Sequence, residues 1–215
     1  MKFSEFKYER PNFDQYKATM TSLIDQFKVA SSASEQLNIV TEINETRNHI
    51  ETMATLASIR HSIDTRDEFY DAEQNYWDEY GPLYEEINSL FYDAVVSSPY
   101  RNELEEKLSK QFFTILDYRL KAFSPEIIAD LQEENKLSSQ YTKLLASAKI
   151  PFDGEERTLP GMGKYLLSED RNVREAASKA KYAFFEEHEA EIDEIYDQLV
   201  KVRTRIAKKL GFNNF

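Results

Sequence analysis

Apolar residues recur every three or four positions along almost the whole chain, which is the period of an amphipathic α-helix. The first such segment begins at Asn12 or Asp14, either of which can cap a helix, and extends to about Ala30. A second begins at Ser34 and is apolar on two neighbouring faces, a pattern typical of a helix buried between several others. We therefore expect two buried helices in the first third of the chain.

The middle of the chain continues this pattern with one interruption. Residues 67–100 form a helical stretch in which Pro82 predicts a break or a kink, because proline lacks the amide hydrogen that a helix needs. Residues 101–123 form one further predicted helix. Ser124, which is followed by proline, is a suitable N-cap for a helix that extends to about Ala148.

The apolar period then changes. Residues 148–159, AKIPFDGEERTL, place Asp153 and Gly154 between two short apolar runs, which indicates a β-hairpin, and Pro151 restricts its strand to an edge position. Beyond a glycine-containing loop, Ser168 is the predicted N-cap of one long helix whose apolar residues recur from Val173 to Leu210.

These patterns predict a mainly α fold, a multi-helix bundle with long helices and one small β-hairpin near residues 148–160. We expect an N-terminal helical region over residues 1–123. Residues 124–215 would then form a second region of a helix, the hairpin and the long final helix. Glycine and proline number only five and six, which argues against a sandwich or barrel with many tight turns.

Composition and net charge argue against several classes of partner and of chemistry. The formal net charge of the 215 residues is −12, which disfavours nucleic acid and anionic membranes as partners. No apolar run approaches the roughly 18 residues that a membrane-spanning helix needs, and the first residues lack the apolar core of a signal peptide. Cysteine is absent, which excludes disulfides and a thiol nucleophile and fits a cytoplasmic location.

Histidine is the first candidate for chemistry. A helical zinc peptidase site requires H-E-x-x-H, because residues four apart share a helix face and both imidazoles reach one ion. His188 begins the sequence HEAEI, so Ile192 occupies the position of the second histidine. His49 and His61 lie twelve residues apart, on different faces of their predicted helix. We interpret all three as structural residues.

The acidic segment 67–100 is the second candidate. It carries nine carboxylates and nine aromatic residues but no lysine or arginine. One interpretation is a negative groove wall whose aromatic side chains grip a cationic or peptide ligand. The other, which we prefer, is a solvated acidic face over an aromatic core.

Two further patterns are rejected as sites. The loop TLPGMGKYL has only one residue between its glycines, and Tyr165 follows Lys164 where a phosphate loop needs serine or threonine. Adjacent carboxylates such as Glu186 and Glu187 point in different directions on a helix and do not form an acid–base pair. No catalytic, cofactor-binding or metal-binding residue is therefore predicted in this chain.

Five stretches, taken in order and spacing, together resemble the N-terminal region of oligoendopeptidase F, in the thimet-oligopeptidase-like zinc metallopeptidases. The resemblance extends over essentially the whole chain. The stretches are KYERPN, DTRDEFYDAEQ, SPEIIADLQEENKLSSQYTKLLASAKIPFDGEERTL, SEDRNVREAASKAKYAFF and EIDEIYDQLVKVRTRIAKKLGFNNF.

This resemblance implies a mostly helical fold with a deep peptide-binding cleft, and hydrolysis of internal bonds in short peptides. In the family, zinc is held by H-E-x-x-H and a further glutamate. Those elements lie downstream of anything resembling residues 1–215, so no catalytic or zinc-binding residue is transferred to this chain. We expect it to be part of a longer peptidase, to form part of the cleft wall, and to be inactive and zinc-free alone.

A second interpretation of the chain remains open. The chain can instead be a free-standing acidic helical interaction module without peptidase activity, whose acidic aromatic segment binds a basic partner. In the resembling family the catalytic half would complete the cover of the apolar stripe from Val173 to Leu210, so we expect self-association of the isolated chain. Peptide preference and the residues that line a cleft are not predicted by these patterns.

Overall fold

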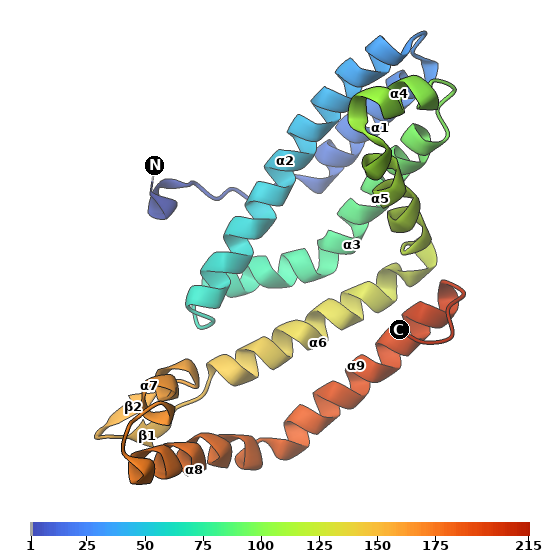
Figure 1. Ribbon diagram of the computed structural model, residues 1–215. Coiled ribbons are helices and arrows are strands. Elements are labelled where there is room, and N and C mark those ends of the chain that lie inside the picture. Colours follow the sequence, from blue (N-terminus) through green and yellow to red (C-terminus); the bar gives the residue numbers. More distant parts are fainter. Residues whose placement is uncertain (1) are drawn as a thin grey trace. The chain divides into compact units, whose positions relative to one another are not determined.

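The computed structural model describes residues 2–215, which form nine α-helices, three short 3₁₀ turns and one two-stranded sheet (Figure 1). This confirms the predicted mainly α fold with one small hairpin. The chain divides into two compact units. The helical unit comprises the residues up to Gln132 together with Ile206–Phe215, and the hairpin unit comprises Glu133–Arg205.

Three long helices form the core of the helical unit: α1 (Phe13–Val29), α2 (Ala33–Ile63) and α3 (Glu68–Val96). Each begins at a side-chain N-cap that accepts a hydrogen bond from a first-turn amide, namely Asn12, Ser32 and Asp67. The start of α2 at Ser32 corrects the predicted start at Ser34. Large apolar side chains from all three helices are almost fully buried: Met20, Phe27, Ile43, Phe91 and Val95.

Pro82 lies inside α3, which continues through it. The proline removes one amide donor from the helical ladder, and Figure 1 shows that α3 bends midway along its length. The predicted interruption is therefore a bend and not an end.

The predicted helix 101–123 is wrong in one respect, because it is two helices. They are α4 (Arg101–Leu108) and α5 (Lys110–Lys121), separated by Ser109. Ser109 has φ = 81° and ψ = 150°, which no helix accommodates, and its Oγ accepts a hydrogen bond of 3.3 Å from the amide of Phe112. Ser109 thus ends one helix and caps the next without any glycine or proline.

The predicted cap at Ser124 lies in the helical unit, just before the next long helix. Ser124 accepts a hydrogen bond from the amide of Glu126, and the 3₁₀ turn η2 (Pro125–Ile127) leads into α6 (Ile128–Ala146). In the helical unit, the Lys209 ammonium lies 2.5 Å from the largely buried Asp130 carboxylate.

The hairpin unit contains the predicted β-hairpin. Strand β1 (Ile150–Phe152) pairs with β2 (Glu155–Arg157) in antiparallel register, with Ile150 opposite Arg157. Asp153 and Gly154 have φ values of 54° and 75°, as a type I′ turn requires. The elements that follow are the 3₁₀ turn η3 (Pro160–Met162), α7 (Gly163–Leu166), α8 (Arg171–Glu187) and α9 (Glu189–Lys209).

The last predicted helix differs from the structure at two points. Its N-cap is Asp170, whose side chain accepts from the Asn172 amide, whereas Ser168 accepts from the amide of Asp170 in the preceding turn. The helix is also interrupted at His188, which ends α8 with φ = −104° and ψ = 13°. Figure 1 shows the chain changing direction there. Because the apolar steps of three and four continue across His188, the sequence pattern did not indicate this break.

Candidate functional site

The three histidines lie in separate settings. His188 packs against the Phe184 ring at 4.5 Å between centroids, and its Nδ1 lies 3.7 Å from the Glu191 carboxylate. His61 is buried near the end of α2, with Nε2 3.4 Å from an Asp71 oxygen, whereas His49 is exposed. The twelve residues between His49 and His61 correspond to about 18 Å along a helix.

These settings do not fit a zinc ion. Residues 2–215 contain no group of three or more histidine, cysteine, aspartate or glutamate side chains that could hold a metal. The residue four positions after His188 is Ile192, which has no ligand atom, so only one imidazole is presented there. Within the described part of the chain, the histidines therefore provide no ligand set for a single ion.

The glycine loop is helical. Gly161 lies in η3 and Gly163 begins α7, so the backbone amides are used in helical turns instead of forming a phosphate cradle. The Lys164 ammonium lies 4.6 Å from the centre of the Tyr165 ring.

The acidic aromatic segment is the part of the chain that concentrates polar chemistry. It forms α3 and the turn that follows, and its carboxylates range from exposed to buried. Asp67, Glu68 and Asp93 are exposed, whereas Glu73 and Asp78 are buried. The preferred interpretation, a solvated acidic face over an aromatic core, therefore holds for only some of these residues. The core is aromatic, as expected: Trp77, Tyr84, Phe91 and Tyr92 are all buried.

Glu73 is neutralised by the N-terminal segment. The Arg10 guanidinium donates two hydrogen bonds to its carboxylate, from Nε at 2.9 Å and from Nη2 at 2.6 Å, and the Tyr8 hydroxyl donates a third. Burial by itself would raise the pKa of Glu73, but the hydrogen bonds from Arg10 and Tyr8 together outweigh it and lower the pKa. Burial, and then the Glu73 carboxylate, raise the pKa of Tyr8.

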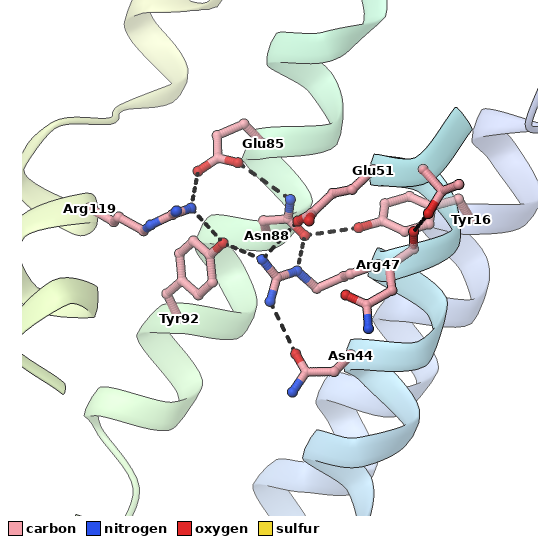
Figure 2. A network of polar contacts seen from close by, with 10 residues as sticks. Tyr16, Asn44, Arg47, Glu51, Glu85, Asn88, Tyr92 and Arg119 are labelled. Carbon is pink, nitrogen blue, oxygen red and sulfur yellow. Dashed lines mark hydrogen bonds and ion pairs between the residues drawn. The ribbon is translucent and has the colours of Figure 1, made fainter. Parts of the chain in front are cut away.

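A second polar network lies between α1, α2, α3 and α5, centred on Arg47 (Figure 2). Its Nε donates to Asn88 Oδ1 at 3.0 Å, its Nη1 to Asn44 Oδ1 at 3.2 Å, and its Nη2 to the Tyr92 hydroxyl at 2.6 Å. Asn88 Oδ1 also accepts from the Tyr16 hydroxyl at 2.9 Å.

The outer part of this network includes a second guanidinium. Arg119 on α5 donates to the Tyr92 hydroxyl at 3.1 Å and lies 4.0 Å from the Glu85 carboxylate. Burial raises the pKa of Tyr92, although both guanidinium groups oppose this. The network therefore joins four helices through phenol, amide and guanidinium groups.

Arginine side chains from distant parts of the sequence thus contact the acidic aromatic segment within the fold. Arg10, Arg47 and Arg119 lie 63, 41 and 27 positions from their α3 partners Glu73, Asn88 and Tyr92. The sequence offered no local signal for these pairs, because residues so far apart share no helix face.

One groove lies within the hairpin unit, where α6 and α9 run side by side in opposite directions (Figure 1). Its volume is about 570 Å³ and its walls include Tyr141, Ile192, Tyr196 and Leu199. Arg203 beside it donates to Glu134 at 2.7 Å, which joins the two helices. The groove is apolar on most of its surface and contains no pair of groups arranged for acid–base chemistry.

The fold and these sites define a class: a helical protein in which Glu73 and Arg47 are paired with the chain's own side chains and whose described residues contain no set of metal ligands. The model of the peptidase M3 N-terminal domain matches residues 3–123. The chain therefore belongs to the M3 peptidase family through this domain. No curated protein matches the chain significantly.

Solved structures extend the similarity to the whole chain. PZ peptidase A, in complex with an inhibitor, is 54% identical with a TM-score of 0.97. A structure described as an oligoendopeptidase F from Bacillus anthracis str. Ames is 48% identical with a TM-score of 0.98. Both similarities cover 100% of this chain, but only 38% and 40% of the other two chains. The chain thus spans about two fifths of the length of the structures it matches.

Among the described residues, none of the helices is long and apolar enough to cross a bilayer.

Proposed function

We propose that this chain is the non-catalytic N-terminal helical part of a zinc-dependent, cytoplasmic oligoendopeptidase that hydrolyses internal bonds of short peptides. In this proposal residues 1–123 form a helical region of the wall that encloses the substrate cleft. Residues 124–215 lead toward the catalytic part. Zinc and the catalytic residues belong to the remaining three fifths of such a protein.

The observation that carries the proposal is the similarity over the entire chain to peptidase structures of more than twice its length. The internal pairing of Glu73 and of the Arg47 network supports a scaffold role, since these groups are engaged with one another and do not present reactive atoms.

A chimera tests the proposal. The 38% of PZ peptidase A that matches this chain is replaced by residues 1–215, and turnover of a quenched short peptide is measured with and without a chelator. We expect turnover within about tenfold of the parent, with chelator sensitivity retained. A folded, zinc-loaded chimera without turnover would overturn the proposal.

A matched control chimera carries the corresponding part of the Bacillus anthracis oligoendopeptidase F. Thermal melting and bound zinc are compared for both chimeras. If the control folds and is active while the chimera with this chain does not fold, the proposal is also contradicted.

A further inference from the structure

The N-terminal segment, residues 2–12, crosses α2 and α3 as a strap before α1 begins. From Phe6 to Asn12 it has no helical or sheet structure. Its backbone contacts are few: the Phe6 carbonyl accepts from the Arg60 guanidinium, the Pro11 carbonyl from the Tyr76 hydroxyl at 3.3 Å, and the Glu9 amide donates to Met53 Sδ at 3.5 Å. The strap is therefore held mainly by side chains: the Phe3 ring lies 5.7 Å from the Arg60 guanidinium on α2, and Tyr8 and Arg10 bind α3.

Tyr8 enters an aromatic pocket on α3. Its ring makes edge contacts with Phe69 and Tyr70, with centroids 6.1 and 6.0 Å away. Its hydroxyl accepts a hydrogen bond of 3.2 Å from Trp77 Nε1 and donates one to Glu73. The pocket thus recognises both the ring and the hydroxyl of a tyrosine.

Arg10 lies two residues further along. It binds both oxygens of the same Glu73 carboxylate, and its guanidinium lies over the Tyr76 ring at 4.7 Å from the centroid. The side chain of Glu73 is only 4% exposed while that of Arg10 is 47% exposed. A bidentate pair that also stacks on an aromatic ring distinguishes arginine from lysine.

We propose that Glu73 and the aromatic side chains around it form a binding groove for a Tyr-X-Arg peptide segment, which this chain fills with its own residues 8–10. The strap is displaceable, and the groove accepts the same segment from another polypeptide. The proposal is independent of the peptidase activity proposed above.

We expect the strap to be displaceable because side chains, and few backbone hydrogen bonds, attach it to α2 and α3. Segments with few buried backbone hydrogen bonds open locally at a lower free-energy cost than the core. When the strap leaves, Glu73 loses all three of its hydrogen-bond donors from the strap, and a buried carboxylate without a cation is unstable. The empty groove therefore favours any occupant that supplies both a phenol and a guanidinium.

The geometry favours a separate polypeptide over a second copy of this chain. Only Pro11 and Asn12 separate Arg10 from the start of α1, and four residues span at most about 14 Å. Asn12 also caps α1, which is packed against α2 and α3. A second copy would have to bring its own helical core into that distance in order to insert its strap.

The test uses Trp77, which is the single tryptophan of the chain and contacts Tyr8 directly. The full chain carries Tyr8→Ala and Arg10→Ala, which empties the groove, and the peptide acetyl-KYERPN-amide is titrated while Trp77 emission and its quenching by acrylamide are recorded. The matched control peptide, acetyl-KFEKPN-amide, has the same charge and length but lacks the hydroxyl and the guanidinium.

We expect KYERPN to restore the emission and quenching of the parent chain and to bind at least tenfold more tightly than KFEKPN. The parent chain should require at least tenfold more KYERPN, because its own strap competes at high effective concentration. Equal binding of the two peptides, or no response in a variant with unchanged helical content, would overturn the proposal. A dimer of the parent chain in light scattering that Tyr8→Ala and Arg10→Ala abolish would indicate strap exchange between copies instead, which also overturns it.

A second measurement keeps the test valid if the double variant does not fold. Hydrogen exchange is followed in the unmodified chain with and without excess KYERPN. Faster exchange of the strap amides, with the core of α1 to α3 unchanged, is the expected result. Strap exchange that is unaffected by the peptide contradicts the proposal.

Discussion

Replacing Arg47 by lysine should destabilise the helical unit more than replacing it by methionine. Arg47 is 14% exposed in its side chain and donates three hydrogen bonds in three directions, to Asn88, Asn44 and Tyr92. A lysine ammonium is a single point and cannot reach all three acceptors, yet it keeps the buried charge. Hydrogen bonds to charged groups contribute about 1.5–3 kcal/mol each, so the loss of two, partly offset by water, should cost about 2–4 kcal/mol.

Methionine removes the charge together with its desolvation cost. Asn88 Oδ1 keeps the hydrogen bond from Tyr16, and the Tyr92 hydroxyl keeps the one from Arg119. The thioether retains much of the contact that Arg47 makes with the ring of Tyr92. The remaining acceptor, Asn44, is partly exposed to water. We therefore expect a cost of about 1–2 kcal/mol, since two of the three partners keep another hydrogen bond and the third reaches water.

Equilibrium unfolding in urea measures both variants, with circular dichroism for the helices and Trp77 emission as a second probe. Typical domain stabilities of about 5–15 kcal/mol leave both variants folded. Coincident transitions with the two probes would justify a two-state fit. The reasoning is refuted if methionine costs at least 1 kcal/mol more than lysine, because the charge and not the satisfied acceptors would then dominate.

Three further predictions concern single features. Ser109 has a positive φ that favours glycine, so Ser109→Gly should stabilise the protein by about 0.5–1 kcal/mol. Ser109→Ala keeps the backbone strain and loses the cap to Phe112, so it should destabilise the protein by about 1 kcal/mol. Melting temperatures that shift in the same direction for both variants would contradict this. Because the pKa of Glu73 is lowered, its ion pair contributes stability above the usual carboxylate pKa of about 4.3, and this stability is lost as the pH falls through the lower native pKa. Trp77 emission should therefore change in that acid range before helicity is lost. A change centred above pH 5 would rule out Glu73 as the cause. The isolated chain should self-associate through exposed side chains such as Tyr182 and Tyr196, and more strongly as salt screens its net charge of −12. Light scattering on a sizing column tests this. A monomer at both low and moderate salt, without binding of a hydrophobic dye, would exclude it.

The sequence predicted most of the secondary structure because its signals are local. The apolar period located the helices, and Asp153-Gly154 located the hairpin, where the observed φ values match the expected turn. The interruptions at Ser109 and His188 were missed because neither involves glycine or proline and the apolar steps continue across both positions. Side-chain capping and backbone geometry decide these breaks, and neither is visible in the pattern.

The polar sites were predictable only in part. The concentration of carboxylates and aromatic residues in α3 was evident, but the burial of Glu73 depends on Arg10 and Tyr8, more than sixty positions earlier. The tertiary fold alone brings these groups together. The same holds for Arg47, whose partners Asn88 and Tyr92 lie on another helix.

The central claim is that this chain is a non-catalytic part of a metallopeptidase, and zinc binding together with turnover of the isolated chain tests it most directly. The chain is incubated with zinc and dialysed, bound metal is quantified, and a quenched short peptide is assayed with and without chelator. The account predicts substoichiometric zinc and no chelator-sensitive turnover, because His188 has no second histidine four residues away and the described residues contain no cluster of metal ligands. One zinc per chain together with chelator-sensitive cleavage would contradict it.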